Sequence, residues 1–223
     1  DWSSDVCSSD LPMLSVGDVM RRIPGVQTTD NSSTAGSAIS LNVGVRGLTG
    51  RYSPRSTVLL DGIPLAVAPY GQPQLSFAPI SLANIESIDV VRGAGAVRYG
   101  PQNVGGIINF STRAVPSTPG LTGDVSVRHN AYAGGGGNTQ YSTFLGSQLD
   151  NGLGLALLYS GQQGREWRDG SADRVNDLAL KFRYDIDASS QVYGKLSYFD
   201  VLSRTPGGLT VAEYNADRFQ NTR

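Results

Sequence analysis

The sequence predicts an α+β globule followed by antiparallel strands of the kind that line a membrane β-barrel. Between Arg46 and Thr112, short runs of β-branched residues alternate with glycine and proline, which is typical of buried strands joined by tight turns. After Pro119, apolar and polar residues alternate with period two. Glycine supplies 28 of the 223 residues, against an average of about 7%, as expected of a β protein rich in turns.

Local patterns define the elements of the first half. Leu14–Arg22 predicts a short amphipathic helix with Ser15 as its cap, ended by Pro24-Gly25. A polar loop, Gln27–Ser40, follows. Strands are then expected near Leu41–Arg46, Thr57–Leu60, Ser87–Arg92 and Ile107–Thr112.

Two connecting features complete this globule. Asp61-Gly62 predicts a hairpin turn, and a short helix is expected around Leu82–Ile85. The globule ends near Arg113, where the sequence AVPSTPG predicts a hinge-like linker.

Five strands are predicted in the second half, at about 121–131, 140–149, 153–161, 176–185 and 191–200. In the fourth of them, Leu178, Leu180, Phe182 and Tyr184 alternate with Ala179, Lys181 and Arg183. Apolar residues outside and charged residues inside favour a barrel strand around a wet lumen. The alternation alone leaves a soluble β-sandwich open as an alternative.

The connections between these strands are expected to alternate in length. Tight turns are predicted at Asp150–Gly152 and Asp187–Ser190, which we assign to the periplasmic side. Longer loops are predicted at Tyr132–Thr139, Gln162–Arg174 and Ser203–Arg223, which we assign to the extracellular side.

Composition excludes several functions. A net charge of −1 gives no basic surface for nucleic acid. His129 is the only histidine, no Cys/His cluster suggests a metal site, and no triad or carboxylate pair suggests an enzyme. Residues 1–11, which contain the only cysteine, Cys7, are unlike the rest, so we interpret them as a foreign head. The polar end at Arg223 suggests a fragment.

The order of motifs resembles that of TonB-dependent outer-membrane receptors. VRG is followed by LLDGIP and then by VVRG, YGP and GGIINF. This resemblance implies a plug domain over residues 12–115 and the first five strands of an incomplete 22-stranded barrel over 116–223. It also implies an outer-membrane location in a Gram-negative bacterium, embedding in lipid, a monomer, and energy from TonB through a segment missing here. A soluble plug-like binding module is the alternative.

Within this family, the segments SPRSTVLLDGIPLAVAPYGQPQLSFAPISL and TPGGLT are most similar to receptors for ferric citrate. That similarity implies import of a ferric chelate, with iron bound only inside the pre-formed chelate and no cofactor or metal site. By position, Thr34, Gln72 and Gln74 are the implied substrate-binding residues. The two glutamines also suit an ordinary proline-bounded loop, and another siderophore remains the alternative substrate.

Arg46 and Arg92 each end an apolar run and precede glycine. An arginine at the end of an apolar strand usually has a carboxylate partner, because burying it unpaired is costly. The family resemblance implies that both arginines form plug–barrel contacts with glutamates of the barrel wall. The residues themselves also allow local pairing with Glu86 or Asp89.

Overall fold

The computed structural model describes residues 16–28, 43–45, 56–65, 80–91, 106–187 and 189–222. They form two compact units that meet between Thr112 and Arg113. The elements of the first unit are α1 (Val16–Arg21), β1 (Val26–Thr28), β2 (Val43–Val45), β3 (Ser56–Leu60), β4 (Ile63–Pro64), the 3-10 helix η4 (Leu82–Asn84), β5 (Ile85–Val91) and β6 (Gly106–Thr112). Those of the second are β7 (Gly120–Ala131), β8 (Gly137–Gln148), β9 (Leu153–Arg165), β10 (Ala172–Asp185), β11 (Gln191–Arg204) and α2 (Val211–Ala216).

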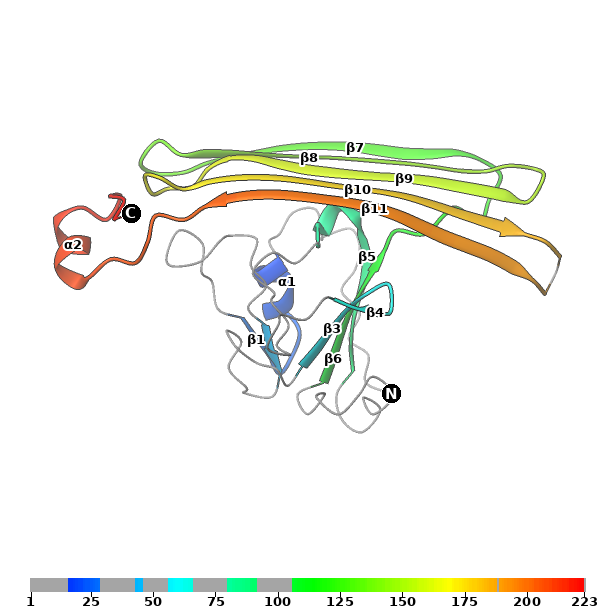
Figure 1. Cartoon of the computed structure of the whole chain (residues 1–223), viewed down its shortest axis with the longest axis horizontal. Coiled ribbons are helices and arrows are strands. Elements are labelled where there is room, and N and C mark those ends of the chain that lie inside the picture. Colours follow the sequence, from blue (N-terminus) through cyan, green and yellow to red (C-terminus); the bar gives the residue numbers. More distant parts are fainter. Residues whose placement is uncertain are drawn as a thin grey trace. The chain divides into compact units, whose positions relative to one another are not determined.

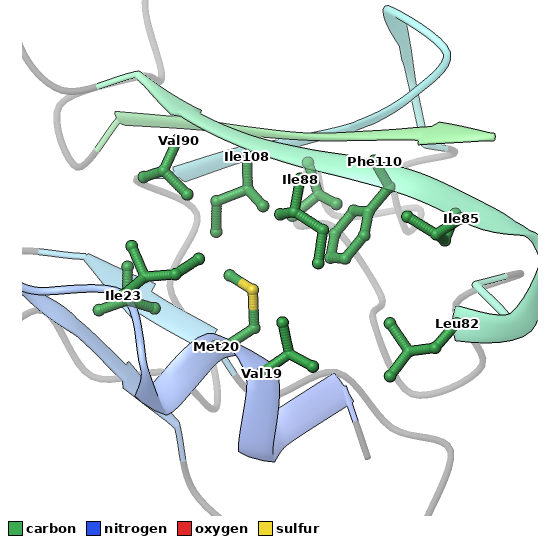
Figure 2. Close-up of a cluster of buried hydrophobic side chains, with 11 residues drawn as sticks. Val19, Met20, Ile23, Leu82, Ile85, Ile88, Val90, Ile108 and Phe110 are labelled. Atoms are coloured by element: carbon green, nitrogen blue, oxygen red, sulfur yellow. The ribbon is translucent and has the colours of Figure 1, made fainter. Parts of the chain in front are cut away.

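The first unit is built on a four-stranded sheet in the order β4-β3-β6-β5. β3 and β6 run parallel, while the other neighbours are antiparallel, and β1 pairs separately with β2. Helix α1 packs against the main sheet through Val19 and Met20, which meet Ile88, Ile108 and Phe110 in a closed apolar core (Figure 2). These five side chains are completely buried, so the predicted helix and strands are held by a dry core.

The turn between β3 and β4 is the predicted hairpin turn at Asp61-Gly62. Both residues have positive φ, 52° and 77°, as a type I′ turn requires. The Asp61 carboxylate accepts hydrogen bonds from the backbone N–H of Thr112 (2.7 Å) and from its hydroxyl (2.9 Å). The Gly62 N–H donates to the side-chain oxygen of Asn109. The turn therefore fixes the end of β6 as well as its own hairpin.

The second unit is one antiparallel sheet in chain order, β7 to β11, drawn from green to orange in Figure 1. Its ladders run without interruption, from Gly120 opposite Gln148 at one edge to Ala172 opposite Arg204 at the other. The five predicted strands are confirmed. The fold class, an α+β unit followed by antiparallel strands, is confirmed as well.

The tight turns at Asp150–Gly152 and Asp187–Ser190 are as predicted, but the predicted bounds of the three longer loops are wrong. β9 continues to Arg165 and β10 begins at Ala172, so most of Gln162–Arg174 is strand. β8 likewise begins at Gly137. The apolar alternation stops before the backbone pairing does, because the outer strand residues such as Gln163 and Arg174 are polar but still paired with each other. The segment Ser203–Arg223, predicted as a loop, contains the helix α2.

No helix in the described ranges is both long enough and apolar enough to cross a membrane. The division into residues 1–11, 12–115 and 116–223, with a foreign head, stays a prediction. Leu14 and Ser15, the predicted start and cap of the first helix, and most of the loop 27–40 lie outside the described residues.

Candidate functional site: a strand sheet with two unlike faces

One face of the second unit is apolar and open. Residues opposite each other on neighbouring strands share a face, and Leu180 lies opposite Leu157 of β9 and Leu196 of β11. The exposed fractions of the large apolar residues on this face range from 36% to 77%. We define the apolar face as Leu121, Val125, Val127, Leu145, Leu155, Leu157, Leu178, Leu180, Phe182, Tyr184, Val192, Leu196 and Tyr198.

A row of tyrosines borders this apolar face. Tyr159, Leu178 and Tyr198 are direct ladder neighbours, and the ring of Tyr141 lies 5.9 Å from that of Tyr159. The Tyr159 hydroxyl donates to the side-chain oxygen of Asn176, the first polar residue beyond the row. Amphipathic aromatic rings of this kind are typical of the boundary between lipid and water.

The opposite face carries the linker between the two units. We call it the linker face and define it by Gly146, Ala156, Ala179, Lys181 and Arg183. Val115 packs on a small buried cluster of this face, made of Phe144, Ala156, Leu158 and Ala179. The Lys181 ammonium donates to the backbone carbonyl of Arg113 at 2.8 Å. The linker is thus bound to the sheet, which contradicts its prediction as a hinge.

Arg113 and Arg183 make further polar contacts on the linker face. The Arg113 guanidinium makes two hydrogen bonds to the Asp124 carboxylate, at 3.0 and 2.5 Å. Its central carbon also lies 3.8 Å from the centroid of the Phe144 ring, within cation–π range. Arg183 donates to the side-chain oxygen of Gln148 at 2.8 Å and to the carbonyl of Pro116 at 3.5 Å. The predicted inward cations therefore hold the linker.

The connections at one end of the sheet are joined by Arg168. This side chain is only 3% exposed, and its guanidinium donates to the carbonyls of Gly207 (2.7 Å) and Gln220 (2.8 Å). Trp167 packs edge-on against Phe219, with ring centroids 6.0 Å apart. The segment after β11 is therefore fastened to the β9–β10 connection, an arrangement that sequence reasoning missed and for which the sequence carries no recognisable motif.

Tyr132, in the connection between β7 and β8, lies near the same end of the sheet. Burial raises the pKa of its hydroxyl, and the nearby carboxylates of Glu166 and Asp173 raise it further. Glu166 and Asp173 are themselves buried, so this end of the sheet concentrates polar groups away from solvent. In the described ranges no group of three His, Cys, Asp or Glu side chains could hold a metal ion.

The substrate-binding residues predicted from the sequence, Thr34, Gln72 and Gln74, all lie outside the described residues. The predicted plug–barrel contacts Arg46 and Arg92 do too. All five assignments therefore stay predictions. The described site is the strand sheet itself, with its apolar face, its linker face and its joined connections.

The comparisons with known proteins agree with this arrangement. Residues 8–107 match the model of the TonB-dependent receptor plug domain. The structure of the ferric citrate transporter FecA in its unliganded form matches the whole chain, with a TM-score of 0.89 and 44% sequence identity. The chain belongs to the TonB-dependent receptor family. The first unit therefore carries the plug domain, and β7 to β11 are strands of the barrel type that follows it.

Two further relatives show how widely this arrangement is shared. The vitamin B12 transporter BtuB of Vibrio cholerae is 34% identical over 191 residues, which is 82% of the chain. The ferric enterobactin receptor PfeA has the same fold over 90% of the chain, with a TM-score of 0.72 and 19% identity. The chain spans 29% of that BtuB, 33% of PfeA and 34% of FecA. These relatives are transporters and receptors, and none is an enzyme.

Proposed function

We propose that the parent protein is a TonB-dependent transporter of the Gram-negative outer membrane that imports ferric citrate. The observation that carries this proposal is the likeness to the ferric citrate transporter FecA, at 44% identity over the whole chain. In this proposal TonB supplies the energy. The iron arrives inside its chelate, and the receptor works as a monomer without a cofactor.

The apolar face supports the membrane location. Its leucines, valines and tyrosines form a continuous band across all five strands of the second unit. A contiguous exposed apolar surface of this kind requires an apolar environment, and lipid supplies it around an outer-membrane barrel. The row of tyrosines at one border of the band fits the lipid–water interface.

The substrate is the finer part of the proposal. Identity to BtuB is 34% and identity to PfeA is 19%, so sequence likeness favours the ferric citrate transporter over both. In the proposed site, Thr34 and Gln72 donate hydrogen bonds to the anionic chelate, and Gln74 assists from the same loop. Another ferric siderophore and vitamin B12 are the alternative substrates.

Uptake by the full-length receptor tests this assignment. Cells that depend on the receptor should take up radiolabelled ferric citrate, and an excess of unlabelled ferric enterobactin or vitamin B12 should not compete. Absence of ferric citrate uptake, together with uptake of radiolabelled ferric enterobactin or vitamin B12 by the same cells, would replace the proposed substrate.

The double variant Thr34→Ala/Gln72→Ala tests the proposed binding residues. Hydrogen bonds to a charged group contribute about 1.5–3 kcal/mol each, so losing two should weaken binding of ferric citrate by about 10²–10⁴-fold. The matched control, Thr118→Ala/Gln191→Ala, changes the same residue types at exposed positions of the second unit and should bind normally. Unchanged binding by the first double variant would remove both residues from the site.

A further inference from the structure

The chain passes from the first unit to the second between Thr112 and Arg113, and each of these two residues is bound within its own unit. On one side, Thr112 is buried, and both its backbone N–H and its hydroxyl bind the Asp61 carboxylate of the first unit. On the other side, Arg113 is bound through its guanidinium to Asp124 and through its carbonyl to Lys181 of the second unit. A single peptide bond therefore separates a residue fastened to the plug sheet from one fastened to the barrel strands.

Small residues under the linker provide independent evidence that it is seated on the sheet. A Cβ atom added to Gly146 would lie 2.6 Å from the Pro116 ring, and one added to Gly154 would lie 2.6 Å from Val115 Cγ1. Ala156 lies directly opposite Gly146 on the ladder. An unbonded side chain at position 146 or 154, even that of alanine, would press on the linker, so β8 and β9 form a cradle for it.

The polar contacts complete this cradle. Lys181 and Arg183 follow each other on the linker face of β10 and donate to the carbonyls of Arg113 and Pro116. Ionised donors make the stronger class of hydrogen bond, and the guanidinium–carboxylate pair of Arg113 and Asp124 is bidentate. Residues 113–116 are thus held by backbone contacts, side-chain contacts and close packing at once.

We propose that residues 113–116, which follow β6 directly in the chain, form a fixed strap on the linker face of the second unit. The strap stays on the linker face while substrate passes, and the displacement that transport requires occurs before Thr112 in the chain. Lys181, Arg183 and Asp124 are positioning residues for this strap. The transport part of this inference rests on the proposed function, whereas the seating of the strap does not.

Cysteine labelling in the full-length receptor tests the seating without any substrate. Val115→Cys should react with a maleimide at least about tenfold more slowly than Ser117→Cys, which lies on an exposed part of the same linker. Adding Lys181→Met should speed the labelling of residue 115. Lys195→Met removes the same charge directly across the ladder and should not. Equal rates at positions 115 and 117 would overturn the strap.

A disulfide between Val115→Cys and Gly154→Cys tests whether the strap stays in place during transport. The approach of Val115 Cγ1 to a Cβ at position 154 is too close for unbonded atoms, but it brings the sulfurs of two cysteines within reach of a covalent bond. Uptake should be the same with the disulfide formed and after its reduction. Loss of uptake that reduction restores would show that the strap must detach, and would overturn the proposal. If the substrate assignment alone is wrong, ferric citrate uptake is absent in the unmodified receptor while the labelling pattern remains.

Discussion

The two units of this chain place their apolar residues in opposite environments. In the first unit, Ile88, Ile108 and Phe110 are completely buried between α1 and the sheet. In the second, Leu180 is 46% exposed and Leu196 is 74% exposed, although both lie in the middle of long strands. Ala179, next to Leu180 in sequence, is only 3% exposed.

The two patterns fit two different surroundings. The first unit hides its apolar side chains because it folds against water, where burial of apolar surface drives folding. The second unit turns its large apolar side chains outward and keeps alanine, lysine and arginine on the linker face, which is the pattern of a strand between lipid and a polar interior. The buried apolar runs of the first unit and the period-two alternation of the second therefore correspond to two opposite arrangements.

The largest effect should come from the core of the plug unit. Phe110→Ala removes a fully buried ring that packs between the sheet and α1, and such truncations cost about 3–5 kcal/mol. Urea unfolding of the plug in the full-length receptor, followed by protease sensitivity, measures this loss. The control Ile63→Ala changes a residue of the same unit that is 70% exposed and should cost far less; equal losses would contradict the dry core.

The next effect separates the two faces of one strand. Leu196 belongs to the apolar face, and its neighbour Ser197 lies opposite Ala179 of the linker face. Leu196→Arg should destabilise the receptor by about 2–4 kcal/mol in a bilayer, as for an arginine near the membrane midplane, whereas Ser197→Arg should change stability little. Reversible folding into lipid vesicles gives both values. A larger loss for Ser197→Arg would reverse the assignment of the faces.

Much of this fold could be predicted because its determinants are local. The alternation from Leu178 to Tyr184 was enough to place β10, and Asp61-Gly62 was enough to place the hairpin turn, since each depends on neighbouring residues alone. The strand ends were less predictable. Pairing of Gln163 with Arg174 depends on the ladder continuing beyond the apolar band, which residue type does not indicate.

The linker contacts and the role of Arg168 could not be predicted, because both join residues far apart in the chain. The sequence of residues 114–119 is typical of a linker, but Lys181 and Arg183 hold this part of the chain from a strand more than sixty residues away in sequence. Helix α2 was predictable in principle. Thr210 followed by Glu213 is a capping-box pattern, and the structure contains that box. Thr34, Gln72 and Gln74 remain predictions from resemblance.

The smallest effect concerns α2, which belongs neither to the dry core of the first unit nor to the apolar face of the second. None of its residues is buried, so local polar bonds hold it. The Glu213 carboxylate accepts from the backbone N–H of Thr210 (2.7 Å) and from its hydroxyl, and the Glu213 N–H donates to the Thr210 side chain. Thr210→Ala should destabilise the helix by about 1 kcal/mol, the usual cost of losing an N-cap. Faster amide exchange in residues 213–217 of the full-length receptor would report it.

The same capping box makes α2 sensitive to pH, unlike the dry core and the apolar face. The Thr210 backbone N–H, and secondarily its hydroxyl, lower the pKa of Glu213 below its ordinary value of 4.5. A lowered folded-state pKa means that this stabilisation is present above pH 4.5 and is lost as the pH falls through the folded value. Protection of α2 amides, after correction for intrinsic exchange, should therefore fall below about pH 4.5 in the unmodified receptor, and Glu213→Gln should flatten this dependence. An unchanged pH profile in Glu213→Gln would assign the sensitivity to another group.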